Sequence, residues 1–159
     1  NDPSIKWVHP DHIHLTLKFL GEVEDRQIND VCSAASQTAG LFEPFDFHIA
    51  GAGSFPPGGA ARVLWAGITE GGEDLQALAD AIDQACHKLG FPLEGRRFSS
   101  HITLARVKNI AAGHKARQAV EAVGPLDIGV QGVSSITVFQ SVLERGGPIY
   151  TAMHHAPLK

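Results

Sequence analysis

Long apolar runs are missing from the 159-residue sequence, and none approaches the roughly 20 residues that a membrane-spanning helix needs. Cysteine is scarce too: Cys32 and Cys86 belong to no CxxC pair and show no zinc-site spacing. We therefore expect reduced thiols in a cytoplasmic protein and no structural metal. Lys and Arg number 13 against 17 Asp and Glu, so nothing favours binding to a membrane or to long duplex nucleic acid.

What is present is typical of a folded globular protein, with 43% hydrophobic and 19% charged residues. The length fits one domain over residues 1–159, which can be built from two similar halves. Apolar spacing predicts strands and helices that do not alternate regularly, so we expect an α+β fold. The predicted strands cover 13–20, 45–49, 62–68, 98–106, 126–131, 134–143 and 149–154, and the predicted helices cover 25–38, 73–89 and 114–122.

The tetrapeptide His-x-Thr-Leu occurs twice, beginning at His14 and at His101. Each copy lies in a strand-like segment, so the histidine and the threonine two residues later, Thr16 or Thr103, point to the same side. One His-x-Thr among nine histidines would carry little weight, but two extended copies in the same pattern are hard to attribute to chance. Their wide spacing predicts two similar lobes that each present one strand to a shared cleft.

Two imidazoles and two hydroxyls around one point suit a phosphate group. The hydroxyls can bond the non-bridging oxygens while one histidine takes a proton from water and the other gives one to the leaving oxygen. Histidine exchanges protons near neutral pH, so this chemistry needs neither a metal nor a covalent intermediate. Lys18 and Arg106, which follow the two copies, are expected to offset charge on the phosphoryl oxygens.

Residues 51–60 are rich in glycine and proline and predict a loop beside the cleft. No GK[ST] sequence follows, so a nucleoside-triphosphate loop is not indicated. Phe55 in this segment is expected either to stack on a nucleobase or to pack on the core.

With both copies in view, the chain resembles the two-histidine (2H) phosphoesterase superfamily, and within it the LigT-like RNA 2′,3′-cyclic phosphodiesterases, also called 2′-5′ RNA ligases. The resemblance rests on stretches spread over nearly the whole sequence, WVHPDHIHLTLKFLGEV at 7–23, SFPPGGAARVLWAGI at 54–68, FSSHITLARV at 98–107 and, more weakly, VFQSVLERGGPIY at 138–150.

The resemblance implies a bilobed α+β fold, with two similar antiparallel-sheet lobes and helices around a central cleft. It implies hydrolysis of RNA 2′,3′-cyclic phosphate ends to 2′-phosphomonoesters, with 2′-5′ ligase activity in some members and no cofactor. His14 would donate a proton to the leaving oxygen and His101 would accept one from water. Thr16 and Thr103 would bind the phosphate, Arg106 would add a contact, and Phe19 matches an aromatic position near the nucleotide. The expected partners are RNA ends or small cyclic nucleotides, bound by a monomer.

Two departures from the family pattern are visible. The sequence begins almost directly at Trp7-Val8, so the N-terminal strand and helix of the family are expected to be missing. Ser100 precedes the second histidine, where proline is common in the family.

Two other functions stay open. A nucleotide-binding module could keep the same cleft with little catalysis. A metal-dependent hydrolase could use His12 and His14, although no carboxylate or cysteine completes a ligand set at a convincing spacing.

Overall fold

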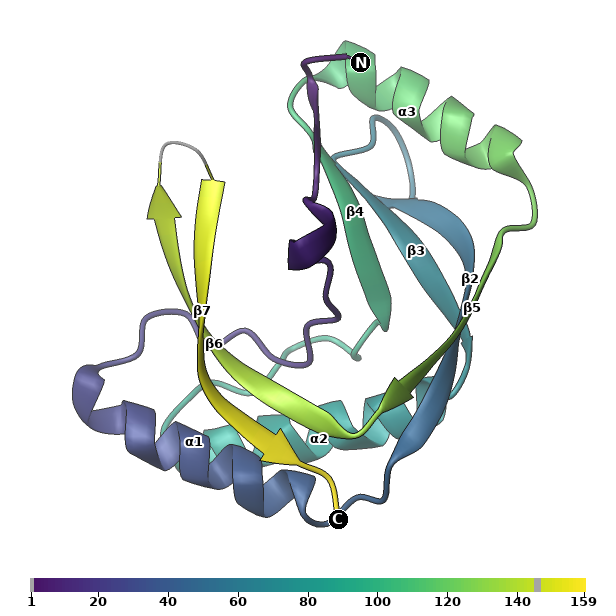
Figure 1. Cartoon of the computed structure of the whole chain (residues 1–159). Coiled ribbons are helices and arrows are strands. Elements are labelled where there is room, and N and C mark those ends of the chain that lie inside the picture. The colour runs from purple at the N-terminus through teal and green to yellow at the C-terminus, as the bar shows by residue number, and fades with distance from the viewer. Residues whose placement is uncertain (1, 145–146) are drawn as a thin grey trace. The chain divides into compact units, whose positions relative to one another are not determined.

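Figure 1 shows the computed structural model, which describes residues 2–144 and 147–159. The elements in chain order are β1 (Ile5–Trp7), a 3₁₀ helix (Pro10–His12), α1 (Asp25–Ala39), β2 (Phe45–Phe55), β3 (Val63–Glu70), α2 (Gly72–Lys88), β4 (His101–Val107), α3 (Ile110–Val123), β5 (Asp127–Val133), β6 (Ser135–Glu144) and β7 (Gly147–Pro157).

The strands form a five-stranded sheet in the order β1-β4-β3-β2-β5 and a two-stranded sheet of β6 and β7. The pairs β1–β4, β4–β3, β3–β2 and β6–β7 are antiparallel. The α+β fold class is therefore confirmed, whereas the two sheets differ in strand number within the described ranges.

The chain divides into two compact units. Unit 1 consists of Asn1–Thr16, Phe47–Gly72 and Ser100–Gln131, and unit 2 of Leu17–Asp46, Glu73–Ser99 and Gly132–Lys159. His14, Thr16, His101 and Thr103 all belong to unit 1. The expectation that each lobe supplies one copy of the tetrapeptide is therefore wrong. The assignment of residues 1–159 to a single domain stays a prediction.

In unit 1, α3 covers one face of the large sheet. Ala112 and Ala116 of α3 pack with Leu64 of β3 and with Ala105 and Val107 of β4. The helix begins four residues earlier than 114 because Asn109 caps it: Asn109 Oδ1 accepts a hydrogen bond from the backbone N–H of Ala112 at 2.8 Å. This packing identifies the side of the sheet that faces α3.

In unit 2, α1 and α2 pack on the β6–β7 hairpin. The face of α2 predicted from helical spacing is buried, with Leu75, Leu78, Ala79, Ile82 and Cys86 in the core. Val31 of α1 joins this cluster, and Ile136 and Val138 of β6 pack against it. Amphipathic spacing thus located both helices within one or two residues.

Two local expectations were wrong. Residues 13–20 form no continuous strand: Leu15 makes one isolated bridge, and Leu17 and Leu20 then turn into the unit 2 core at a spacing that strand alternation does not allow. The loop predicted at 51–60 begins later, because β2 pairs with β3 as far as Phe55.

The predicted strand at 149–154 is part of β7, which also contains the histidine pair near the C-terminus. The imidazole of His154 is hydrogen-bonded to Ser36 at 2.6 Å, and that of His155 to Thr137 at 2.9 Å.

Candidate active site on the unit 1 sheet

The two His-x-Thr copies meet at one isolated antiparallel bridge, which joins Leu15 to Ile102, the middle residue of the second copy. If regular antiparallel geometry extends one residue to each side of this bridge, His14 stands opposite Thr103 and Thr16 stands opposite His101, with directly opposite Cβ atoms about 4.5–5.5 Å apart and their side chains on one face. We call this the motif face. In this geometry the two histidines take diagonal positions, about 7 Å apart at Cβ, and the two threonines take the other diagonal.

A bulge in β4 brings Arg106 to the same face. Strict alternation from His101 and Thr103 would turn Arg106 toward α3. The pairing with β3 shifts, however: Trp65 stands opposite Thr103, but the preceding residue of β3 stands opposite Ala105, which leaves Leu104 as the extra residue. Ala105 is accordingly 0% exposed in the core, and Arg106 is exposed on the motif face.

The orientation of His14 is set by its own backbone neighbour. Its Nδ1 atom lies 2.7 Å from the carbonyl oxygen of His12, which ends the 3₁₀ helix. A carbonyl can only accept, so Nδ1 carries the hydrogen. The Nε2 atom is then the one that gains or loses a proton when the ring changes charge.

His101 lies against an aromatic group that β2 and β3 supply. The Phe55 ring meets the imidazole edge-on, with centroids 5.1 Å apart and planes at 86°, and stands 5.3 Å from the Trp65 ring. Phe55 flanks the second histidine at the end of β2 and does not join the core beneath α3, whereas its expected stacking on a nucleobase stays a prediction. Edge-to-face contacts of this kind stabilise by about 0.5–1.5 kcal/mol and hold a ring in orientation.

The indole of Trp65 lies over Gly53 of β2, where a Cβ would overlap it. Glycine is thus required at this position by close approach. The indole Nε1 is buried and has no hydrogen-bond acceptor within residues 2–144 and 147–159.

Lys18 has a different environment from the one expected. Its ammonium lies 2.6 Å from the carboxylate of Asp83, donates to the carbonyl of Pro92 at 2.7 Å and lies 3.6 Å from Glu94. The side chain is only 4% exposed. Lys18 therefore ties the segment after α2 to that helix within unit 2, and we leave it out of the candidate site.

Phe19 belongs to unit 2 and is 75% exposed, so it does not turn into the core as strand alternation would require. Its expected place near the nucleotide stays a prediction.

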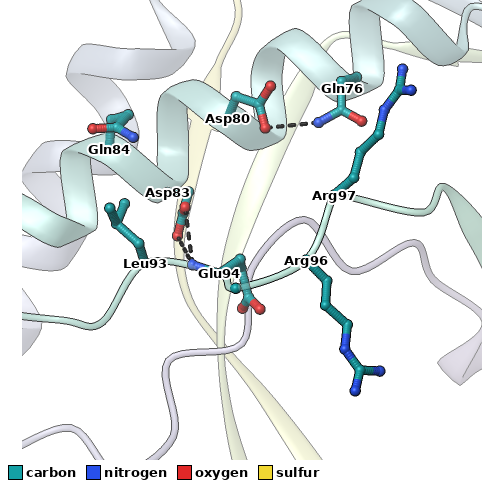
Figure 2. A pocket seen from close by; sticks show the side chains of 9 residues that line it. Gln76, Asp80, Asp83, Gln84, Leu93, Glu94, Arg96 and Arg97 are labelled. Atoms are coloured by element: carbon teal, nitrogen blue, oxygen red, sulfur yellow. Dashed lines mark hydrogen bonds between the residues drawn. The ribbon is translucent and has the colours of Figure 1, made fainter.

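A pocket in unit 2 offers a different set of groups. Figure 2 shows it between α2 and the segment 93–97, where Asp83 accepts two hydrogen bonds of 3.2 Å from the backbone N–H of Glu94. Arg96 and Arg97 line it together with the carboxylates of Asp80, Asp83 and Glu94. The three carboxylates would repel a phosphate, so this pocket is a poor phosphate-binding site.

No group of three His, Cys, Asp or Glu side chains in the described part of the chain is placed to hold a metal ion. Nor does any described helix combine the length and apolarity needed to cross a membrane.

The family model described as LigT like Phosphoesterase matches residues 1–65 and 67–150. This chain belongs to that family. Curated relatives support the assignment: RNA 2′,3′-cyclic phosphodiesterase of Methanothermobacter thermautotrophicus is 34% identical over 152 residues, which cover 96% of this chain and 82% of the relative. The protein of the same name from Aeropyrum pernix is 31% identical over 94% of this chain and 84% of its own length.

Solved structures agree with the LigT-like fold. The protein TT0787 of Thermus thermophilus superposes with a TM-score of 0.82 at 28% identity and covers 99% of this chain and 84% of its own. E. coli LigT complexed with 3′-AMP gives a TM-score of 0.75 at 26% identity, covering 98% and 82%.

Sequence reasoning gave no role to two residues that this LigT-like chain places on the motif face, Trp65 and Lys6. Trp65 stands opposite Thr103, and Lys6 stands opposite Arg106. Alternation in 62–68 could have placed Trp65 on one face, but only the pairing register identifies which strand it adjoins. β1 is only three residues long, too short for alternating hydrophobicity to predict a strand.

Proposed function

We propose that this chain hydrolyses RNA 2′,3′-cyclic phosphate ends to 2′-phosphomonoesters, with His14 and His101 as its proton-transferring pair. The observation that carries the proposal is the antiparallel bridge between Leu15 and Ile102, because regular pairing around it would set each histidine opposite the threonine of the other copy. Such a diagonal arrangement suits a reaction in which one proton leaves on one side of a phosphorus atom and another arrives on the opposite side.

In the proposed complex the cyclic phosphate sits between the two threonine hydroxyls. Thr16 and Thr103 donate hydrogen bonds to its non-bridging oxygens, and the nearby guanidinium of Arg106 offsets the negative charge that grows there. The edge-on Phe55 ring keeps the His101 imidazole in place. Phe19 stays a proposed contact for the nucleoside.

The proton steps balance as follows. Neutral His101 takes a proton from a water molecule, whose oxygen forms a new bond to phosphorus. The bond from phosphorus to O3′ breaks, and protonated His14 gives its Nε2 hydrogen to O3′. The product keeps its phosphate on O2′, and a proton returned through solvent resets the pair. The hydrogen bond from His14 Nδ1 to the His12 carbonyl keeps Nε2 as the donating atom.

The relatives named RNA 2′,3′-cyclic phosphodiesterase support this choice of substrate, as does the structure of E. coli LigT with 3′-AMP. We further propose that RNA ends or small cyclic nucleotides are the partners, that no cofactor takes part, and that a cytoplasmic monomer acts. In ligation of a 2′-5′ bond at the same site, the oxygen of a 5′-hydroxyl would take the place of water, bond to phosphorus and displace O3′.

The test compares His14→Asn and His101→Asn with the wild type on a short RNA that ends in a 2′,3′-cyclic phosphate. Each replacement should lower kcat by about 10²-fold or more, because general acid or base catalysis contributes about 10²–10⁴-fold. His114→Asn is the matched control, since His114 is exposed on α3, which packs on the opposite face of the sheet.

Wild-type turnover by either site variant would overturn the assignment. Tight nucleotide binding without turnover by the wild type would instead make the chain a nucleotide-binding module.

A further inference from the structure

Beyond the two His-x-Thr pairs, the same edge of β4 carries a third cross-strand pair. The Leu15 segment and β1 both lie along this edge, and β1 pairs with the last part of β4. Lys6 of β1 stands directly opposite Arg106. The bulge at Leu104 brings both side chains to the motif face, about two strand steps, or roughly 7 Å, beyond Thr103.

The neighbouring residues of β1 do not share this direction. Ile5 stands opposite Val107 and packs against the core beneath α3. Trp7 stands opposite the fully buried Ala105 and so has the same orientation as Ile5. Lys6 is therefore the residue of β1 that the register turns toward the motif face.

Lys6 and Arg106 are both exposed, and in the described parts of the chain no acidic side chain forms an ion pair with Arg106. Two exposed cations beside a phosphate-binding site are a natural place for a second phosphate.

We propose that Lys6 binds the phosphate on the 5′ side of the reacting nucleotide. This inference rests on the proposed function and names its substrate class as an RNA end. A nucleotide with a 3′-terminal cyclic phosphate has its next phosphate on its own 5′ oxygen. Arg106 lies between Thr103 and Lys6 along β4 and links the two phosphate positions.

The experiment uses two substrates that differ by one group, adenosine 2′,3′-cyclic phosphate with and without a 5′-phosphate. Values of kcat/KM are measured for the wild type, Lys6→Gln and Lys115→Gln. Lys115 is the matched control because it is exposed on α3, on the covered side of the sheet. The wild type should prefer the 5′-phosphorylated substrate by about 5–10-fold, and added salt should reduce this preference.

Lys6→Gln should abolish the preference for the 5′-phosphorylated substrate and leave hydrolysis of the unphosphorylated substrate unchanged. Lys115→Gln should keep the wild-type preference. Equal loss on both substrates, or an unchanged preference, would overturn the inference and leave Lys6 as a charge that protects an edge strand. Failure of the wild type to hydrolyse either substrate is the separate outcome that would contradict the proposed function.

Discussion

At the scale of single residues, two cations that follow the two copies of one tetrapeptide have different roles. Arg106 is exposed on the motif face, whereas Lys18 is buried among Asp83, Glu94 and the Pro92 carbonyl. Both looked equivalent in sequence, because position relative to a motif does not reveal which side chain finds a buried carboxylate. Long-range partners such as Asp83 are fixed only by tertiary packing.

Lys18→Met should lower the free energy of unfolding by about 2 kcal/mol. The Asp83 carboxylate, whose side chain is only 15% exposed, loses its counter-ion in this variant. Lys88→Met, at the exposed end of α2, should change it by less than about 0.5 kcal/mol. Urea unfolding of both variants at pH 7 measures the difference. Equal stability of the two variants would contradict the structural role of Lys18.

The same ion pair predicts a pH dependence. Burial disfavours the Lys18 ammonium, but the hydrogen bond and charge of Asp83 outweigh it and raise the lysine pKa. Burial likewise opposes ionisation of Asp83, yet hydrogen bonds from Lys18 and the Glu94 N–H lower its pKa. A lowered carboxyl pKa stabilises the fold above the unfolded value, about 4, and this stability is lost as pH falls through the folded pKa.

A raised lysine pKa stabilises the fold below its unfolded value, about 10, and this contribution is lost at higher pH. The difference in stability between the wild type and Lys18→Met should therefore be constant from about pH 5 to 9 and shrink below about pH 4. A difference that grows on acidification would contradict this assignment.

At the scale of elements, the bulge in β4 decides which side chains share the motif face. The sequence predicted the strand, its histidine and an Arg106 contact with the phosphate, but strict alternation alone cannot explain how Arg106 comes to the same side as His101. A bulge depends on pairing with β3 and leaves no mark in the local sequence. For the same reason the contact of Trp65 with Gly53 was not foreseen, since the two residues are neighbours only across the sheet.

The approach of α3 to the loop before β3 gives a test at this scale. A Cβ at Gly113 would lie 2.6 Å from the Ala61 carbonyl oxygen, so the helix must move to accept it. Gly113→Ala should lower the free energy of unfolding by about 1–2 kcal/mol, although alanine favours an isolated helix by about 1 kcal/mol.

Gly72→Ala is the matched control, because a Cβ there meets only the Ser100 hydroxyl at 3.9 Å. Thermal unfolding should show no loss of stability for this variant. A stabilised Gly113→Ala protein would mean that α3 does not approach residues 60–61 so closely.

At the scale of the whole molecule, the sequence predicted the α+β class, the helices and the double motif. Helical spacing in α1 and α2 is a local property, which explains why those predictions succeeded. The membership of both tetrapeptide copies in one compact unit depends on contacts between residues far apart in the chain, and no internal repeat could specify it.

The net charge of −4 also says little about the substrate, because a phosphate site needs only a few local cations. Arg106 is an exposed cation of this kind on the motif face.

The central claim is that the paired histidines transfer protons during hydrolysis of a cyclic phosphate without help from a metal. The most direct test follows a short RNA ending in a 2′,3′-cyclic phosphate, incubated with the protein in excess EDTA, with the product's phosphate located by ³¹P NMR. We predict complete conversion to the 2′-phosphate at the rate seen without EDTA. A 3′-phosphate product, or activity lost to EDTA and restored by a divalent cation, would contradict the account.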